Sequence, residues 1–106
     1  MREIKFRAFQ DQQMLISPIS SNYGLLRFFG MLYEDAKLMQ FTGLQDKNGV
    51  DIYEGDLLEF DGGNKLAVSF EDGGFGCFDN SYQFLPLFYW NMSLAEVVGN
   101  IYENNI

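Results

Sequence analysis

Apolar and polar side chains alternate near the N-terminus, which is typical of strands with one buried and one solvated face. Residues 3–9 alternate strictly, residues 10–13 are polar, and residues 14–16 are apolar. A polar turn between two such stretches indicates a β-hairpin. We therefore predict an N-terminal hairpin with strands at residues 3–9 and 14–16.

Glycine-containing turns divide the middle of the chain into short strands. Residues 46–49, with the sequence Asp, Lys, Asn, Gly, are a strong hairpin signal because Asn and Gly tolerate positive φ. Gly55 is expected to have positive φ at the corner formed by residues 53–56. Two further glycine-rich turns then separate three strands of a predicted meander, at residues 57–60, 65–70 and 75–79.

The last third of the chain continues the same spacing. Residues 82–90 are expected to be extended, with Pro86 at a sheet edge or a bend because proline cannot donate to a ladder. Ser93 and Glu96 have the spacing of a capping box, which predicts one helical turn. Residues 97–102 then form a closing strand. Strand signals about ten residues apart are typical of a small all-β barrel or roll.

The predicted barrel core consists of apolar residues from these strands. They are Phe41, Leu44, Ile52, Leu58, Phe60, Val68, Phe70, Phe78 and Val98.

Size and composition indicate one small domain. The chain has 106 residues, of which 17% are aromatic and 11 are glycine, a mixture that favours short strands and tight turns. Cys77 is the only cysteine, which excludes an intrachain disulfide and suits a reducing compartment. The sequence shows neither the apolar region of a signal peptide nor a run long enough to span a membrane. We therefore expect a cytoplasmic protein without a membrane partner.

Charge is distributed unevenly along the chain. The net charge is −8; residues 1–37 carry five basic and four acidic side chains, whereas residues 38–106 carry two basic and eleven acidic ones. The strongly negative C-terminal part repels a phosphate backbone. Binding of nucleic acid through residues 38–106 is therefore disfavoured. Two interpretations remain open. The acidic residues keep an aromatic protein soluble, or they form an acidic face that binds a basic partner or imitates DNA for a host protein.

The residue types present exclude most catalytic chemistry. There is no histidine, so Ser-His-Asp triads, Cys-His pairs and His-containing zinc sites are all absent. Four acidic residues between positions 54 and 61 are the only plausible cluster for a hard cation. Alternation along a strand places them on both faces, so a solvated rim is expected. Cys77 is interpreted as a buried structural thiol. We predict no enzyme activity, no cofactor and no metal.

Two apolar runs, residues 25–33 and 84–90, do not alternate. One small core can bury only one face of an antiparallel strand, so either the N-terminal segment or another subunit covers the second face. We favour another subunit, because aromatic anchors are typical of protein interfaces. The prediction is a homo-oligomer with interface anchors at Phe28, Phe29, Phe88 and Trp90.

An alternative from a different class uses the N-terminal strand. Arg2, Lys5 and Arg7 accompany Phe6 and Phe9, and basic strands with aromatic residues bind single-stranded nucleic acids by stacking and phosphate contacts. These cations would have to lie together and away from the acidic residues.

Three blocks of the sequence resemble the YopX family, small proteins encoded by phages and prophages whose molecular role is not established. Residues 4–9 are similar to its opening strand, residues 38–60 to its central signature, and residues 98–104 to its closing strand. The resemblance implies one domain, in which an N-terminal β segment (1–36) precedes an SH3-like β-barrel (37–106). It supplies no catalytic residues. The expected protein is thus a phage-derived, non-catalytic, self-associating interaction module whose other partner is an unknown host or phage protein.

Overall fold

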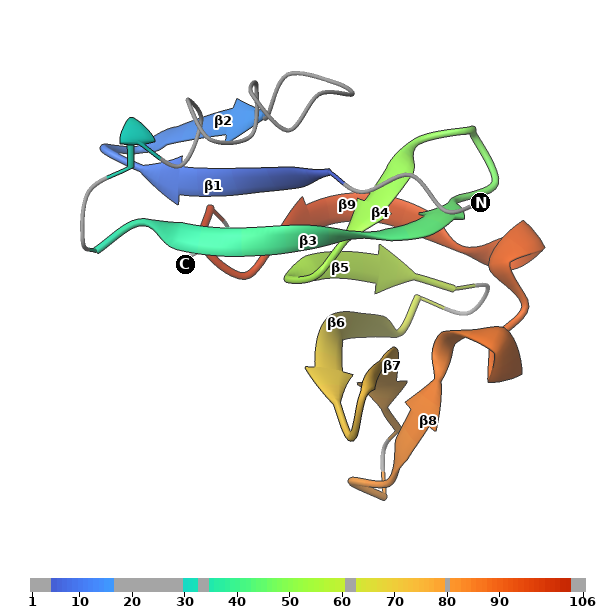
Figure 1. The fold of residues 1–106 in the computed structure, drawn as a ribbon. Helices are drawn as coiled ribbons and strands as arrows, with labels where there is room; N and C mark the ends of the chain where they lie inside the picture. The colour runs from blue at the N-terminus through green and yellow to red at the C-terminus, as the bar shows by residue number, and fades with distance from the viewer. Residues whose placement is uncertain (1–4, 17–29, 33–34, 61–62, 80, 104–106) are drawn as a thin grey trace.

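The computed structural model of the protein describes residues 5–16, 30–32, 35–60, 63–79 and 81–103. In these residues the strands form two antiparallel sheets, with the orders β2-β1-β3-β4 and β8-β7-β6-β5-β9. The second sheet curls into a half barrel beneath the long strand β3 (Figure 1). The all-β prediction is therefore confirmed.

The elements have the following bounds. The first sheet contains β1 (Phe6–Gln10), β2 (Gln13–Ile16), β3 (Lys37–Gln45) and β4 (Asp51–Tyr53). The second contains β5 (Asp56–Glu59), β6 (Lys65–Glu71), β7 (Gly74–Phe78), β8 (Phe84–Pro86) and β9 (Glu96–Asn100). Two short 3₁₀ turns, η1 (Leu87–Tyr89) and η2 (Met92–Leu94), connect β8 to β9.

The N-terminal hairpin forms as predicted and is joined to the rest of the protein through β3. Its two-residue turn places Asp11 and Gln12 at φ 52° and 63°, the positive values that a tight hairpin with the normal strand twist requires. The other edge of β1 pairs with β3, with Phe6 opposite Gln40 and Phe9 opposite Lys37. The first sheet therefore combines the N-terminal segment with strands that we had assigned to the barrel.

The corner between β4 and β5 depends on Gly55. Its φ is +89°, and a Cβ added there would lie 3.0 Å from Sδ of Met39. The Gly55 amide donates to the carbonyl of Val68 at 2.8 Å, and its own carbonyl accepts from the amide of Ile101 at 2.9 Å. The predicted positive φ is confirmed, and this corner connects β6 with the segment after β9.

The predicted turns and meander are also confirmed. Residues 46–50 connect β3 to β4, and β5, β6 and β7 follow one another in antiparallel pairs. Pro86 lies in the edge strand β8, where a missing amide costs no ladder hydrogen bond.

Two local predictions were wrong. The run 82–90 is not one strand, because the chain turns into η1 directly after Pro86. The second 3₁₀ turn is capped by Asn91 and not by Ser93: the Asn91 carboxamide oxygen accepts from the Ser93 amide at 3.1 Å. Asparagine is a strong N-cap, and here it starts the turn before the predicted capping box.

The core consists of two clusters. The larger contains Ile52, Leu58, Val68, Phe75, Cys77, Leu87 and Ala95, and the smaller contains Met39, Phe41 and Tyr53. Of the predicted core residues, Phe41, Ile52, Leu58 and Val68 are buried, and Phe60 is half-buried against the larger cluster.

Four predicted core residues are exposed instead: Leu44, Phe70, Phe78 and Val98. Cys77 takes the inward position of β7, so Phe78 faces the opposite side of the sheet. A bulge in the pairing of β5 with β9 lies at Val98, and Leu44 lies within a similar irregularity between β3 and β4. Bulges change which face a side chain occupies, and the alternation pattern alone does not reveal them.

Most of the first double-sided apolar run, residues 25–33, lies outside the described residues. Gly30, which is described, has helical and not extended backbone. In the part of the chain that the structure describes, no helix has the length and apolar character needed to span a membrane.

Candidate interaction surfaces

A buried ion pair joins the N-terminal hairpin to the corner between β4 and β5. Arg7 on β1 donates to the carboxylate of Asp56 on β5, and its guanidinium lies 4.5 Å from the ring centroid of Tyr53. The second Asp56 oxygen accepts from the Tyr53 amide at 2.8 Å. Both side chains are almost inaccessible to water, with 11% of Arg7 and 1% of Asp56 exposed.

This ion pair corrects one prediction and changes the interpretation of another. Asp56 was expected on a solvated rim, but it is buried, because a charged partner 49 residues away in sequence compensates its charge. Burial raises the pKa of Asp56, while the Tyr53 amide and Arg7 oppose that rise. Arg7 was a candidate for phosphate contact, and the structure uses its charge inside the protein instead.

Lys5 is likewise engaged with the first sheet. Its Nζ lies 2.5 Å from Oδ2 of Asp51 and 4.7 Å from the ring centroid of Phe41. Arg2, the third predicted contact for nucleic acid, lies outside the described residues. The condition set for that alternative was a group of cations away from the acidic residues, and the described members Lys5 and Arg7 do not meet it. Nucleic-acid binding itself stays an untested prediction.

Asp46 fastens the turn between β3 and β4 to the last strand. Its Oδ1 accepts from the amides of Asn48 at 2.8 Å and Val50 at 2.9 Å, and its Oδ2 accepts from the amide of Val97 at 2.9 Å. Desolvation acts to raise the pKa of Asp46, but these three amides and the charge of Lys47 outweigh it, so the pKa is lowered.

Replacing Asp46 by asparagine is expected to lower the free energy of unfolding at neutral pH by about 1.5–3 kcal/mol, because the charge that strengthens three amide hydrogen bonds is lost. Because folding lowers the pKa of Asp46, this stabilisation is present at pH values above the ordinary pKa of 3.8. It disappears as the pH falls through the folded-state pKa. Urea unfolding between neutral pH and pH of about 3 should therefore show the two proteins converging in acid. A constant difference across that range would contradict this role.

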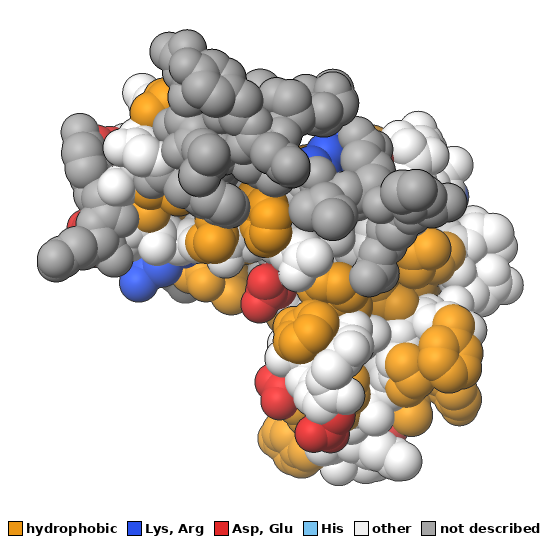
Figure 2. All heavy atoms as spheres, viewed as in Figure 1, with side chains coloured by type: hydrophobic (Ala, Val, Ile, Leu, Met, Phe, Trp, Pro, Cys, Tyr) orange, Lys and Arg blue, Asp and Glu red, His pale blue; other side chains and the backbone are white. Residues whose placement is uncertain are grey.

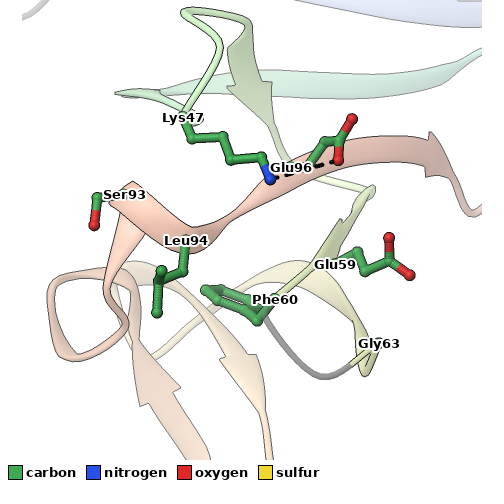
Figure 3. A pocket seen from close by; sticks show the side chains of 7 residues that line it. All are labelled: Lys47, Glu59, Phe60, Gly63, Ser93, Leu94 and Glu96. Atoms are coloured by element: carbon green, nitrogen blue, oxygen red, sulfur yellow. Dashed lines mark ion pairs between the residues drawn. The ribbon is translucent and has the colours of Figure 1, made fainter.

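A pocket of about 440 Å³ opens beside this turn (Figure 3). Its lining includes Lys47, Glu59, Phe60, Ser93, Leu94 and Glu96. Figure 3 shows Lys47 reaching toward Glu96, while Leu94 and Phe60 point toward one another. Nζ of Lys47 lies 3.8 Å from Oε1 of Glu96, and both side chains are 45% exposed, so this is a loose, solvated ion pair.

A second, apolar groove of about 340 Å³ lies where β3, β7 and the β8–η1 segment meet. Leu44, Phe75, Pro86, Leu87 and Phe88 contribute to its walls, and the described residues that line it include no charged side chain. Figure 2 shows hydrophobic side chains gathered over the lobe formed by β8 and η1. We call this surface the β8 groove.

The β8 groove contains one of the predicted interface anchors. Phe88 is 88% exposed and the adjacent Tyr89 is 65% exposed. Trp90 instead packs within the subunit, with its ring centroid 5.3 Å from that of Phe60 and its Nε1 donating to the Leu85 carbonyl at 3.2 Å. The predicted anchors Phe28 and Phe29 lie outside the described residues.

Sequence reasoning misplaced one member of this surface. Leu44 was predicted in the barrel core, but it is 38% exposed and lines the groove. The position of Pro86 was the available signal, because proline in a strand marks an edge or a bend. Of the residues that follow it, Leu87 is buried and Phe88 is exposed.

The remaining candidates for reactive chemistry are the thiol of Cys77 and the acidic side chains. Cys77 is fully buried, and burial raises the pKa of its thiol to about 12, which makes it a poor nucleophile at neutral pH. Among the described residues, no group of three or more His, Cys, Asp or Glu side chains is placed to hold a metal ion.

Both the fold and the sequence are similar to those of known proteins. The whole molecule is similar to the crystal structure of protein EF1440 from Enterococcus faecalis, with a TM-score of 0.60, 23% sequence identity, and coverage of 98% of this chain and 96% of that one. This similarity shows a shared all-β fold. A comparison with curated proteins found no match.

The sequence defines the family more narrowly. The model of the YopX protein family matches residues 19–105, and the chain belongs to the YopX family. The match starts after residues 4–9, so the block that we compared with the family's opening strand lies outside it.

Proposed function

We propose that this protein is a phage- or prophage-encoded, non-catalytic interaction module that acts in the cytoplasm of the bacterial host and self-associates through the β8 groove. The observation that carries the proposal is the exposure of Phe88, 88%, beside a groove with uncharged walls. Leaving an aromatic side chain in water forgoes a contribution of roughly 1.5–3 kcal/mol from burial. An exposed aromatic anchor of this kind is typical of an interface.

A second copy of the chain is the partner that this surface fits best. A two-fold interface uses the same patch on both subunits, so a projecting side chain and a receiving groove must lie close together. Phe88 and the β8 groove satisfy this requirement, because Phe88 forms part of the groove's rim. Each copy carries a charge of −8, and an uncharged contact avoids placing like charges face to face.

Self-association should weaken on truncation of Phe88. We expect Phe88→Ala to raise the dissociation constant at least tenfold, as removal of a central aromatic anchor typically does. Light scattering after size exclusion, across micromolar concentrations, measures this change. High salt should strengthen association of the unmodified protein, because it screens the repulsion between two acidic subunits.

Tyr82 provides a matched control. It is also 88% exposed but does not line the β8 groove, so Tyr82→Ala should leave association unchanged. Equal weakening by both substitutions would show a nonspecific effect of surface aromatics. A monomer of 12.2 kDa at all micromolar concentrations, in low and high salt alike, would refute the proposal.

A further inference from the structure

We infer that the pocket between the β3–β4 turn, the end of β5 and η2 receives an arginine side chain from a basic protein partner. This site is separate from the β8 groove, and the inference does not depend on self-association. It rests on the volume of the pocket, the chemistry of its walls, and the register of two glutamates.

The walls of the pocket suit a side chain with a long apolar stem and a cationic head. Phe60 is half-buried against the core and presents its ring to the cavity opposite Leu94 (Figure 3). Arginine commonly lays its aliphatic stem on apolar surface and stacks its planar guanidinium on an aromatic ring. The volume of about 440 Å³ leaves room for such a side chain together with part of its backbone.

The strand register places two carboxylates where a cation is needed. Glu59 on β5 lies directly opposite Glu96 on β9 and, across its other edge, opposite Lys65 on β6. Both glutamates line the pocket, whereas Lys65 is not among its described lining residues. Like charges directly opposite one another on one face of an antiparallel pair repel and are destabilising. A guanidinium has enough donors to bridge two carboxylates, so a bound arginine would convert this repulsion into attraction.

Lys47 already supplies part of this charge and therefore acts as a competitor. Its ammonium lies 3.8 Å from Glu96, too far for a hydrogen bond, and it forms no ion pair with Glu59. Among the described residues that line the pocket, Lys47, Glu59 and Glu96 are the charged ones, and their charges sum to −1. This excess selects a cation over an anion, and with a protein of net charge −8 it favours a basic partner over a second copy of the chain.

The test uses a short blocked glycine–serine peptide with one central arginine, titrated into ¹⁵N-labelled protein. We expect saturable shifts of the Phe60, Leu94 and Glu96 amides, and no such shifts from the same peptide with citrulline, which has nearly the same shape without the charge. Glu59→Gln and Glu96→Gln should each weaken binding about fivefold, within the range for partly exposed charge pairs. Glu71→Gln, which removes an exposed acid outside the pocket, should not change it.

Lys47→Met gives the sharpest discrimination. It removes the internal competitor, so binding of the arginine peptide should tighten about threefold. The inference is overturned if Lys47→Met weakens binding, if the shifts spread over all acidic residues, or if no saturable shift occurs at the pocket. Saturable shifts of the same amides on addition of inorganic phosphate, abolished by Lys47→Met, would assign an anion site and overturn it as well.

Discussion

Replacing Arg7 by methionine is expected to lower the free energy of unfolding by about 3–5 kcal/mol, the usual cost of leaving a buried charge without its partner. Methionine fills similar volume, but it leaves the carboxylate of Asp56, which is 1% exposed, with the Tyr53 amide as its remaining hydrogen-bond donor. Denaturant unfolding followed by tryptophan fluorescence measures the loss. For a domain of this size it is a large part of a stability margin of about 5–15 kcal/mol.

A double substitution separates the charge from the packing. Arg7→Met combined with Asp56→Leu removes both charges, and hydrophobic replacements of buried ion pairs are often neutral or stabilising. The double variant should therefore be markedly more stable than Arg7→Met alone. Equal stability of these two variants would show that the loss comes from packing around Arg7 and not from the uncompensated charge.

Lys5→Met is the matched control, because Lys5 lies two residues before Arg7 and directly precedes β1. Lys5 pairs with Asp51, but 27% of the Asp51 side chain is exposed, so water can compensate for the missing ammonium. The expected loss is about 1 kcal/mol or less. The contrast tests whether burial, and not the presence of an ion pair, determines how much Arg7 and Lys5 each contribute to stability.

The ion pair also illustrates which parts of the fold were predictable from the sequence. Turns are local, and the residues at 46–49 and Gly55 impose backbone conformations that no tertiary contact needs to supply. The pairing of Arg7 with Asp56 spans 49 residues. Arg7 and Asp56 are each of a residue type that is typical of the solvated face of a strand. Their burial is therefore revealed only by the three-dimensional structure.

The candidate surfaces were likewise only partly predictable from the sequence. Phe88 was predicted as an anchor because its apolar run had more faces than one core can cover, and it is exposed beside the β8 groove. Trp90 came from the same run and packs against Phe60 instead, since the predicted extended strand ends at Pro86 and the chain enters the turn η1 before Trp90. The pocket near Lys47 was not predicted, because it requires the register of Glu59 with Glu96.

Replacing Gly76 by alanine is expected to cost about 3 kcal/mol, at the upper end of the usual range for overpacking. Gly76 is buried in β7, and a Cβ there would lie 2.3 Å from the Leu85 carbonyl oxygen and 2.7 Å from Cζ of Phe84. The closest atom belongs to the backbone, so the collision is relieved only by moving β8 away from β7.

Gly74→Ala is the control, because it lies on the same strand and a Cβ there would meet nothing within 4 Å. Urea unfolding should show Gly74→Ala close to the unmodified protein and Gly76→Ala clearly destabilised; equal stability of the two variants would show that β8 adapts without cost. The β8 groove adds a second readout. Displacing β8 moves Pro86, Leu87 and Phe88 together, because they follow one another in the chain. Under conditions where Gly76→Ala remains folded, it should therefore self-associate more weakly than the unmodified protein, even though Gly76 does not line the groove.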